Sequence, residues 1–157
     1  MPKRIWAVIS VGFALCMSVL DVNIINIVLP TLSHDFGTSP AVTTWIINGY
    51  QLAIVVSLLS FSSLGEIIGY RKVYLSGIGL FCITSLICAL SDSFWTLTIA
   101  RIFQGFSASA ITSVNTAQLR YIYPKSQLGR GMGINAMVVA ISAAAGPSVA
   151  SGILSIA

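Results

Sequence analysis

Two ionisable residues, Asp21 and Arg101, lie well inside hydrophobic stretches of the sequence. A charge at the centre of a membrane helix costs about 2.5–3.5 kcal/mol, so each residue needs a partner or a water-filled cavity. A carboxylate that alternates between a paired state and a hydrated or substrate-bound state can carry a proton or attract a cation, and a nearby guanidinium would modulate its pKa. The two residues are therefore candidates for proton or cation chemistry. The alternative is an ion pair that only fixes the packing of two helices.

The composition indicates an integral membrane protein. Only 8% of the residues are charged and 56% are hydrophobic, and the mean hydropathy is +0.93, whereas a soluble domain has about 25% charged residues. Because backbone polar groups in lipid must be paired within the segment, long apolar stretches are expected to be helices. The sequence predicts an all-α membrane protein with about five transmembrane helices, at residues 5–29, 45–64, 73–90, 94–119 and 132–157. The first stretch exceeds the roughly 7–15 apolar residues of a signal peptide, so we expect it to be retained.

The basic residues predict the orientation of these helices. Seven of the eight Lys and Arg residues fall before the first helix or in the loops after the second and fourth, and the eighth is Arg101. This asymmetry places the N-terminus in the cytoplasm. It also explains the net charge of +4 without a nucleic-acid partner.

The same topology places Asp21 and Arg101 at similar depths. Asp21 precedes Pro30 by nine positions, which puts it roughly 13 Å below the outer end of its helix. Arg101 follows Phe94 by seven positions, or roughly 10 Å below the same face. We expect the two to meet if their helices are neighbours.

Other polar residues within the helices have a simpler interpretation. Hydrogen bonds between helices are the expected role of each one alone; they are Asn23, Asn26, Gln51, Gln104 and Asn115. The three cysteines lie inside predicted helices, where a buried cysteine usually acts as a small apolar filler. No spacing of His, Cys or carboxylates indicates a metal site or a catalytic dyad, so we expect no enzyme activity.

The segment from Leu20 to Pro30 resembles the first-helix signature of drug:proton antiporters of the major facilitator superfamily, in particular the fourteen-helix branch. The shared pattern is Asp21, then Asn26, then Leu29-Pro30. Residues 97–105 are similar to the family's fourth-helix motif, which contains Arg101 and Gln104. The resemblance covers the whole chain and implies that Arg101 takes part in proton coupling, with Asp21, Asn26 and Gln104 at the same site.

Two further motifs of the family occur in the expected order. The loop after the second helix, residues 62–72, resembles the cytoplasmic gating loop, with Ser62 in place of a Gly, Glu66 in place of an Asp and Ile67 in place of a common Arg. Gly69 permits a tight turn there. The fifth helix resembles the antiporter motif only in part, because Gly133, Gly146 and Pro147 keep the consensus whereas Ser142, Ala150 and Ser151 are small replacements. The gating residues that the resemblance implies are Glu66, Gly69, Arg71, Lys72, Gly133, Ser142, Gly146 and Pro147.

These features predict the first part of a multi-pass cell-membrane transporter that exports drugs or other lipophilic cations in exchange for protons. Its partners would be the substrate, protons, the bilayer and the C-terminal half of the parent protein. We expect no cofactor, because the proton gradient would supply the driving force. We expect the chain to end within its fifth helix. The alternatives are a member of the superfamily that moves a sugar, peptide or siderophore, and an inactive truncated remnant. The residues leave twelve and fourteen helices in the parent equally open.

Overall fold

The computed structural model describes residues 2–154, and every regular element in that range is a helix. The long helices are α1 (Pro2–Asp35), α3 (Trp45–Ile68), α4 (Tyr70–Ala89), α5 (Phe94–Ile122) and α6 (Leu128–Leu154). A short helix α2 (Pro40–Thr43) precedes α3, and one turn of 3-10 helix, η1 (Lys125–Gln127), precedes α6. The prediction of an all-helical fold is confirmed.

The helices extend beyond the apolar segments that predicted them. Helix α1 continues past residue 29 to Asp35, with Pro30 inside it. A proline removes one backbone hydrogen bond, a loss that membrane helices tolerate. Helix α3 reaches Ile68 instead of residue 64, and α4 and α6 begin three and four residues before their predicted starts. Polar residues at these ends can remain helical outside the hydrocarbon, so hydropathy marks the membrane portion and not the helix end. Residues 155–157 of the last predicted helix lie outside the described residues.

A single residue, Gly69, joins α3 to α4. Its φ of 100° lies in a region that L side chains rarely adopt. The Gly69 N–H donates to the Gly65 carbonyl at 3.0 Å, and the Gly69 carbonyl accepts from the Lys72 N–H at 3.1 Å. The glycine thus ends one helix and begins the next, whereas the sequence predicted a tight turn at Gly69 within a longer loop.

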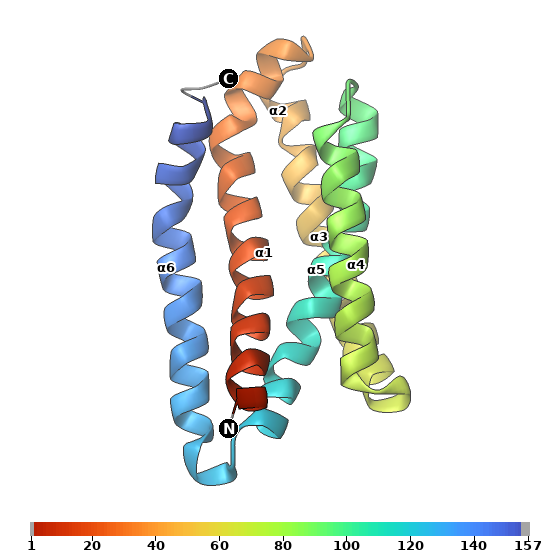
Figure 1. The fold of residues 1–157 in the computed structure, drawn as a ribbon. Helices are drawn as coiled ribbons and strands as arrows, with labels where there is room; N and C mark the ends of the chain where they lie inside the picture. The colour runs from red at the N-terminus through yellow and green to blue at the C-terminus, as the bar shows by residue number, and fades with distance from the viewer. Residues whose placement is uncertain (1, 155–157) are drawn as a thin grey trace.

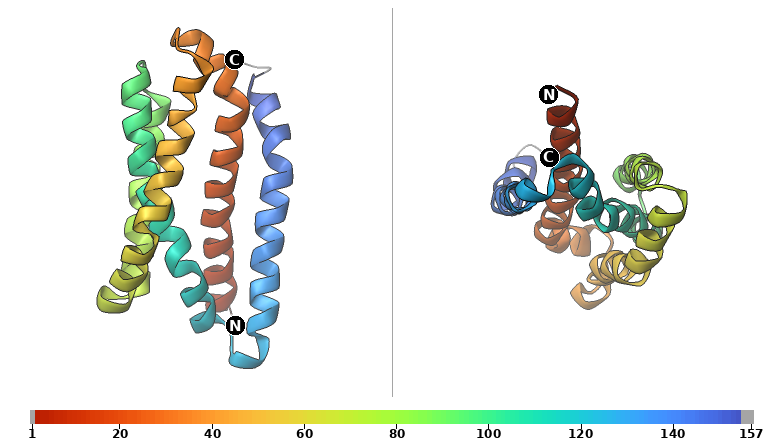
Figure 2. Two further views of the ribbon diagram at one scale, coloured as in Figure 1. Left: turned by 180° about the vertical axis from the view of Figure 1, so that it is seen from behind. Right: turned by 90° about the horizontal axis from the view of Figure 1, so that it is seen from below.

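The long helices form two groups that meet at α5. Helix α6 lies beside α1, whereas α3 and α4 pack on α5, and α5 also contacts α1 and α6 (Figure 1). The view from below shows α5 between α1 and the α3–α4 pair (Figure 2). The N-terminal end of α1 is at the bottom in Figure 1, together with the turn at Gly69 and the connection from α5 to α6. We refer to this side, which the basic residues assign to the cytoplasm, as the inner end.

Helix α5 has a different composition from the other long helices. Within the described residues, four helical segments are long and apolar enough to cross a membrane: Val8–Asp35, Pro40–Ile68, Tyr70–Ala89 and Leu128–Gly152. Helix α5, predicted as the fourth of five spans, is not among them. Its polar side chains are enclosed by neighbouring helices; those buried include Arg101, Gln104, Ser107, Ser109 and Asn115. Helix α5 is the central polar helix of the bundle.

The outer faces of the other helices are strongly apolar. On α3, for example, Val56 is 73% exposed and Leu59 is 80% exposed. Such a large exposed apolar surface requires a lipid environment rather than water. The chain is therefore a multi-pass integral membrane protein.

Candidate functional site

Asp21 and Arg101 form an ion pair between α1 and α5. Arg101 Nη1 donates to Asp21 Oδ2 at 2.6 Å. The side chain of Asp21 is only 18% exposed and that of Arg101 only 7%. The pairing expected from their similar depth is present, and it joins residues 80 positions apart in the sequence.

Gln104 connects this ion pair to α4. Its Nε2 donates to the other oxygen of Asp21, Oδ1, at 3.2 Å and to Ser85 Oγ at 2.8 Å. The thiol of Cys88 donates weakly to Gln104 Oε1 at 3.6 Å. Gln104 is fully buried, so its amide is held with the nitrogen towards the carboxylate. Three helices therefore contribute polar side chains to one network.

Tyr50 of α3 forms another wall of the site. The centre of its ring lies 6.0 Å from Cζ of Arg101, a distance at which an aromatic ring attracts a cation. Arg101 Nε is buried and has no hydrogen-bond partner among the described residues. The guanidinium thus has Asp21 as its ion-pair partner, and its buried Nε–H has no acceptor among the described residues.

A cavity of about 400 Å³ lies beside the ion pair, between α1, α4 and α5. Asp21, Arg101, Ser85 and Cys88 line it together with apolar side chains such as Ile24 and Leu97. Its walls extend to Leu32 and Phe36, so it lies on the outer side of the pair. A proton or a small cation could reach the carboxylate through this space.

In this arrangement the buried negative charge of Asp21 is neutralised by Arg101. Both carboxylate oxygens of Asp21 accept hydrogen bonds from the protein, and the positive charge of Arg101 balances the negative one. A cation or proton that binds Asp21 must therefore compete with Arg101, and the guanidinium would then need another partner. This competition is the chemistry that the site can perform.

The structure does not bring Asn26 to this site. Its side chain is exposed, and its Nδ2 donates to the Val22 carbonyl of its own helix at 2.9 Å. Asn23 makes the equivalent bond to the Val19 carbonyl at 2.8 Å. The role that the family resemblance implies for Asn26 thus has no geometric support in this conformation.

The predicted gating loop is an exposed turn at the inner end. Glu66, Arg71 and Lys72 are all exposed, and none of the three has an ion-pair partner among the described residues. The loop's ordered feature is the backbone turn at Gly69. Any latch formed by these charges would need partners outside the described part of the chain.

The small residues of α6 pack on α1. Ser142 is 3% exposed, Ala150 is fully buried, and Gly146 lies between them against Asn23. Gly133 and Pro147 are exposed on the same helix. The spacing of the small residues is therefore explained here by a close approach of two helices within this chain.

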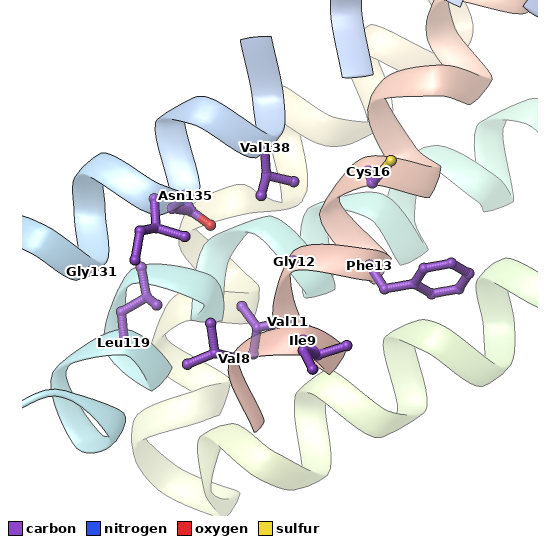
Figure 3. Close-up of a pocket in the computed structure, with 11 residues that line it drawn as sticks. Val8, Ile9, Val11, Gly12, Phe13, Cys16, Leu119, Gly131, Asn135 and Val138 are labelled. Carbon is purple, nitrogen blue, oxygen red and sulfur yellow. The ribbon is translucent and has the colours of Figure 1, made fainter. Parts of the chain in front are cut away.

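A second, more apolar cavity of about 380 Å³ lies between α1 and α6 on the inner side of the ion pair. Val8, Gly12, Cys16, Asn135 and Val138 are among its lining residues (Figure 3). Asn135 Oδ1 accepts a hydrogen bond from Asn115 Nδ2 at 3.3 Å, which gives the cavity a polar group on one wall.

Sequence reasoning missed three residues of the site: Ser85, Cys88 and Tyr50. The interpretation of Cys88 as an apolar filler was incomplete, because its thiol contacts Gln104. Ser85 and Cys88 are three positions apart, so they lie on one face of α4. That spacing within an apolar stretch was a signal that could have indicated a polar partner. Tyr50 had no comparable signal, because tyrosine is also common at membrane interfaces.

Comparisons with known proteins agree with this architecture. The profile of the Major Facilitator Superfamily matches residues 11–157. The uncharacterized transporter YebQ of Escherichia coli is 52% identical over all 157 residues, which cover 34% of that protein. The riboflavin transporter RibZ of Clostridioides difficile is 32% identical over 97% of this chain and 34% of its own length. The tetracenomycin C resistance and export protein of Streptomyces glaucescens is 34% identical over 93% of this chain and 27% of its own length. The chain thus spans about a third of the length of these relatives.

Proposed function

This chain belongs to the Major Facilitator Superfamily, and on that premise we propose that the protein is a secondary transporter that exports lipophilic cations in exchange for protons. The family and its transporter relatives indicate a transporter and not an enzyme. The proton gradient would supply the energy, since one charge that crosses 100 mV releases about 2.3 kcal/mol.

The observation that carries the proposal is the position of Asp21 between Arg101 and Gln104, next to a cavity. Protonation of Asp21 removes its charge and weakens its attraction for Arg101. A cationic substrate would compete for the same carboxylate, so proton and substrate exclude each other. Mutual exclusion at one group is the requirement for exchange.

The apolar cavity between α1 and α6 supports a lipophilic substrate. Its volume of about 380 Å³ lies within the range of roughly 300–1,000 Å³ that is typical of small-molecule sites. It lies against α1, and its lining residue Cys16 precedes Asp21 by five positions, or roughly 7.5 Å along the helix. A substrate with its charge near Asp21 could place an apolar body on this side of α1.

The remaining predicted residues would govern the conformational change. Glu66, Arg71 and Lys72 are free to form ion pairs with a second half of the protein, and Gly69 sets the direction of the loop. On α6, the small face of Ser142 and Gly146 would allow α1 and α6 to slide, and Gly133 and Pro147 would permit bending. These roles rest on the family resemblance.

Two relatives favour different substrates. The tetracenomycin C resistance and export protein supports drug export, whereas the riboflavin transporter supports a neutral solute as a second candidate. Asp21 supports the first candidate, because an ionisable group inside the membrane is expensive and marks ion or proton pathways. We therefore favour the cationic substrate.

Proteoliposomes that contain the full-length protein would test the proposal. With an imposed pH gradient, we expect accumulation of tetraphenylphosphonium that stops when the gradient is dissipated. Asp21→Asn should abolish the proton-driven accumulation. Asp92→Asn is the matched control, because it makes the same chemical change at an exposed loop residue, and it should leave accumulation unchanged.

The alternative outcomes are distinct. If Asp21→Asn transports the lipophilic cation as well as the unmodified protein does, the assigned mechanism is wrong. If tetraphenylphosphonium is not moved but labelled riboflavin is, the second candidate is correct.

A further inference from the structure

A third cavity, of about 610 Å³, lies at the inner end between α1, α4 and α5. We call it the inner-end cavity and define it by Gly69, Tyr70, Arg71, Leu75, Gln118 and Tyr121, which are among its lining residues. It is separate from the Asp21 site, which lies on the outer side, and neither Asp21, Arg101 nor Gln104 lines it. It shares Val11 with the apolar cavity between α1 and α6.

The inner-end cavity has donors and positive charge but no acidic residue. Arg71 is the one full charge among its lining residues, and it has no ion-pair partner within residues 2–154. Gln118 Nε2 is buried and lacks a hydrogen-bond partner in the same part of the chain. A buried donor without a partner is unfavourable, and Gln118 lines the cavity, so an acceptor that enters the cavity could satisfy this nitrogen.

The backbone adds further positive potential. Helix α4 begins at Tyr70 and has 20 residues, and no side chain caps its N-terminus. The partial positive charge of the α4 helix dipole therefore faces the lining formed by Gly69, Tyr70 and Arg71. Unpaired N–H groups at a helix start bind anions such as phosphate.

The location of the cavity indicates the source of the anion. Arg71, Lys72 and Arg120 define the cytoplasmic side, so the cavity lies at the level of the lipid headgroups. Tyr70 and Tyr121 line the cavity, and the centres of their rings are 6.0 Å apart. Tyrosine is enriched at the level of the lipid headgroups. Leu75, which also lines the cavity, is 55% exposed. Its apolar side chain could contact an acyl chain of a lipid whose headgroup occupies the cavity.

We propose that the inner-end cavity binds the phosphate headgroup of an anionic phospholipid from the cytoplasmic leaflet. Arg71 and the start of α4 would bind the phosphate oxygens, and Gln118 Nε2 would donate a hydrogen bond to the same headgroup. The site shares Gly69 and Arg71 with the proposed gating loop, but lipid binding there does not depend on which substrate is transported.

The test is equilibrium binding of labelled phosphatidylglycerol to the purified full-length protein in detergent micelles, with phosphatidylcholine as the neutral comparison. We expect saturable binding of phosphatidylglycerol that phosphatidylcholine does not displace. Arg71→Gln should weaken it by about fivefold, since one basic residue near anionic lipid contributes about 1 kcal/mol. Gln118→Leu should also weaken it although the net charge stays the same.

Arg120→Gln is the matched control. It removes the same charge from an exposed residue on the same side of the membrane, but Arg120 does not line the cavity. The proposal is overturned if Arg71→Gln and Arg120→Gln weaken binding equally, because a general surface attraction would then explain it. It is also overturned if the full-length protein shows no preference for phosphatidylglycerol, which would mean that another segment fills the cavity.

Free glycerol phosphate separates a lipid site from a site for soluble phosphate. It should not displace phosphatidylglycerol at millimolar concentration, because the acyl chains hold the lipid against α1 and α4. If glycerol phosphate binds as tightly as the lipid does, the cavity is a site for a soluble anion and the assignment to a lipid is wrong.

Discussion

A Cβ atom on Gly146 would lie 2.5 Å from the Cβ atom of Asn23 and 3.0 Å from its Cγ atom. Helix α6 therefore approaches α1 more closely than any residue other than glycine permits. Asn23 follows Asp21 by two positions in α1. The contact thus fixes the helix that carries the carboxylate of the candidate site, and it couples the packing of α6 to the geometry of the ion pair.

Gly146→Ala should destabilise the protein by about 1–3 kcal/mol, because the added methyl group overpacks the α1–α6 contact. Gly133→Ala is the control on the same helix, since a Cβ there meets nothing within 4 Å. It should be neutral or stabilising by up to about 1 kcal/mol through helix propensity. Unfolding in detergent, followed by circular dichroism, measures both. Equal stabilities of the two variants would contradict the close approach.

The ion pair predicts a non-additive double mutant. Asp21→Asn or Arg101→Gln alone leaves one buried charge without its partner, which costs about 3–5 kcal/mol. The double variant Asp21→Asn/Arg101→Gln removes both charges, so it should be more stable than either single variant. Its proton-driven transport should still be absent. Additive losses of stability in the same unfolding assay would show that the two charges do not interact.

The membrane class, the helix positions and the Asp21–Arg101 pair could be predicted from the sequence. Each depends on a one-dimensional property: the length of an apolar stretch, the side on which basic residues fall, or the rise per residue along a helix. The similar depth of the two charges made a pair possible, and the contact of α1 with α5 in the structure brings them together. A tight turn at Gly69 followed from glycine's access to positive φ, although the sequence predicted a longer loop around it.

The rest of the site depends on helix rotation and on which helices are neighbours. Ser85 and Cys88 reach Gln104 only because α4 packs on α5 with that face inward. Asn26 matches the family pattern, but the rotation of α1 leaves its side chain exposed. The extension of α1 past Pro30 was also missed, because hydropathy is insensitive to where a helix ends outside the hydrocarbon. Packing in three dimensions decides each of these points.

Gln104→Leu should destabilise the protein by about 1–3 kcal/mol. The change leaves Asp21 Oδ1 and Ser85 Oγ without the donor that both share, and unpaired buried polar atoms carry a desolvation penalty. Gln51→Leu makes the same substitution at an exposed position of α3 and should change stability by less than about 0.5 kcal/mol. Denaturant unfolding of both variants checks the prediction. A loss at Gln51 as large as that at Gln104 would argue against the network.

The turn between α3 and α4 gives the last prediction. Gly69 has a φ of 100°, and a Cβ there would meet nothing within 4 Å. The penalty for Gly69→Ala therefore comes from the backbone alone, and it should be about 1–3 kcal/mol. Gly79→Ala, inside α4 and equally free of neighbours, should be neutral or stabilising because its backbone is already helical. Thermal unfolding of the two variants separates strain from crowding, since neither methyl group touches another residue. If Gly69→Ala unfolds at the same temperature as Gly79→Ala, the turn must adopt a different backbone conformation, and α4 would then begin at another residue.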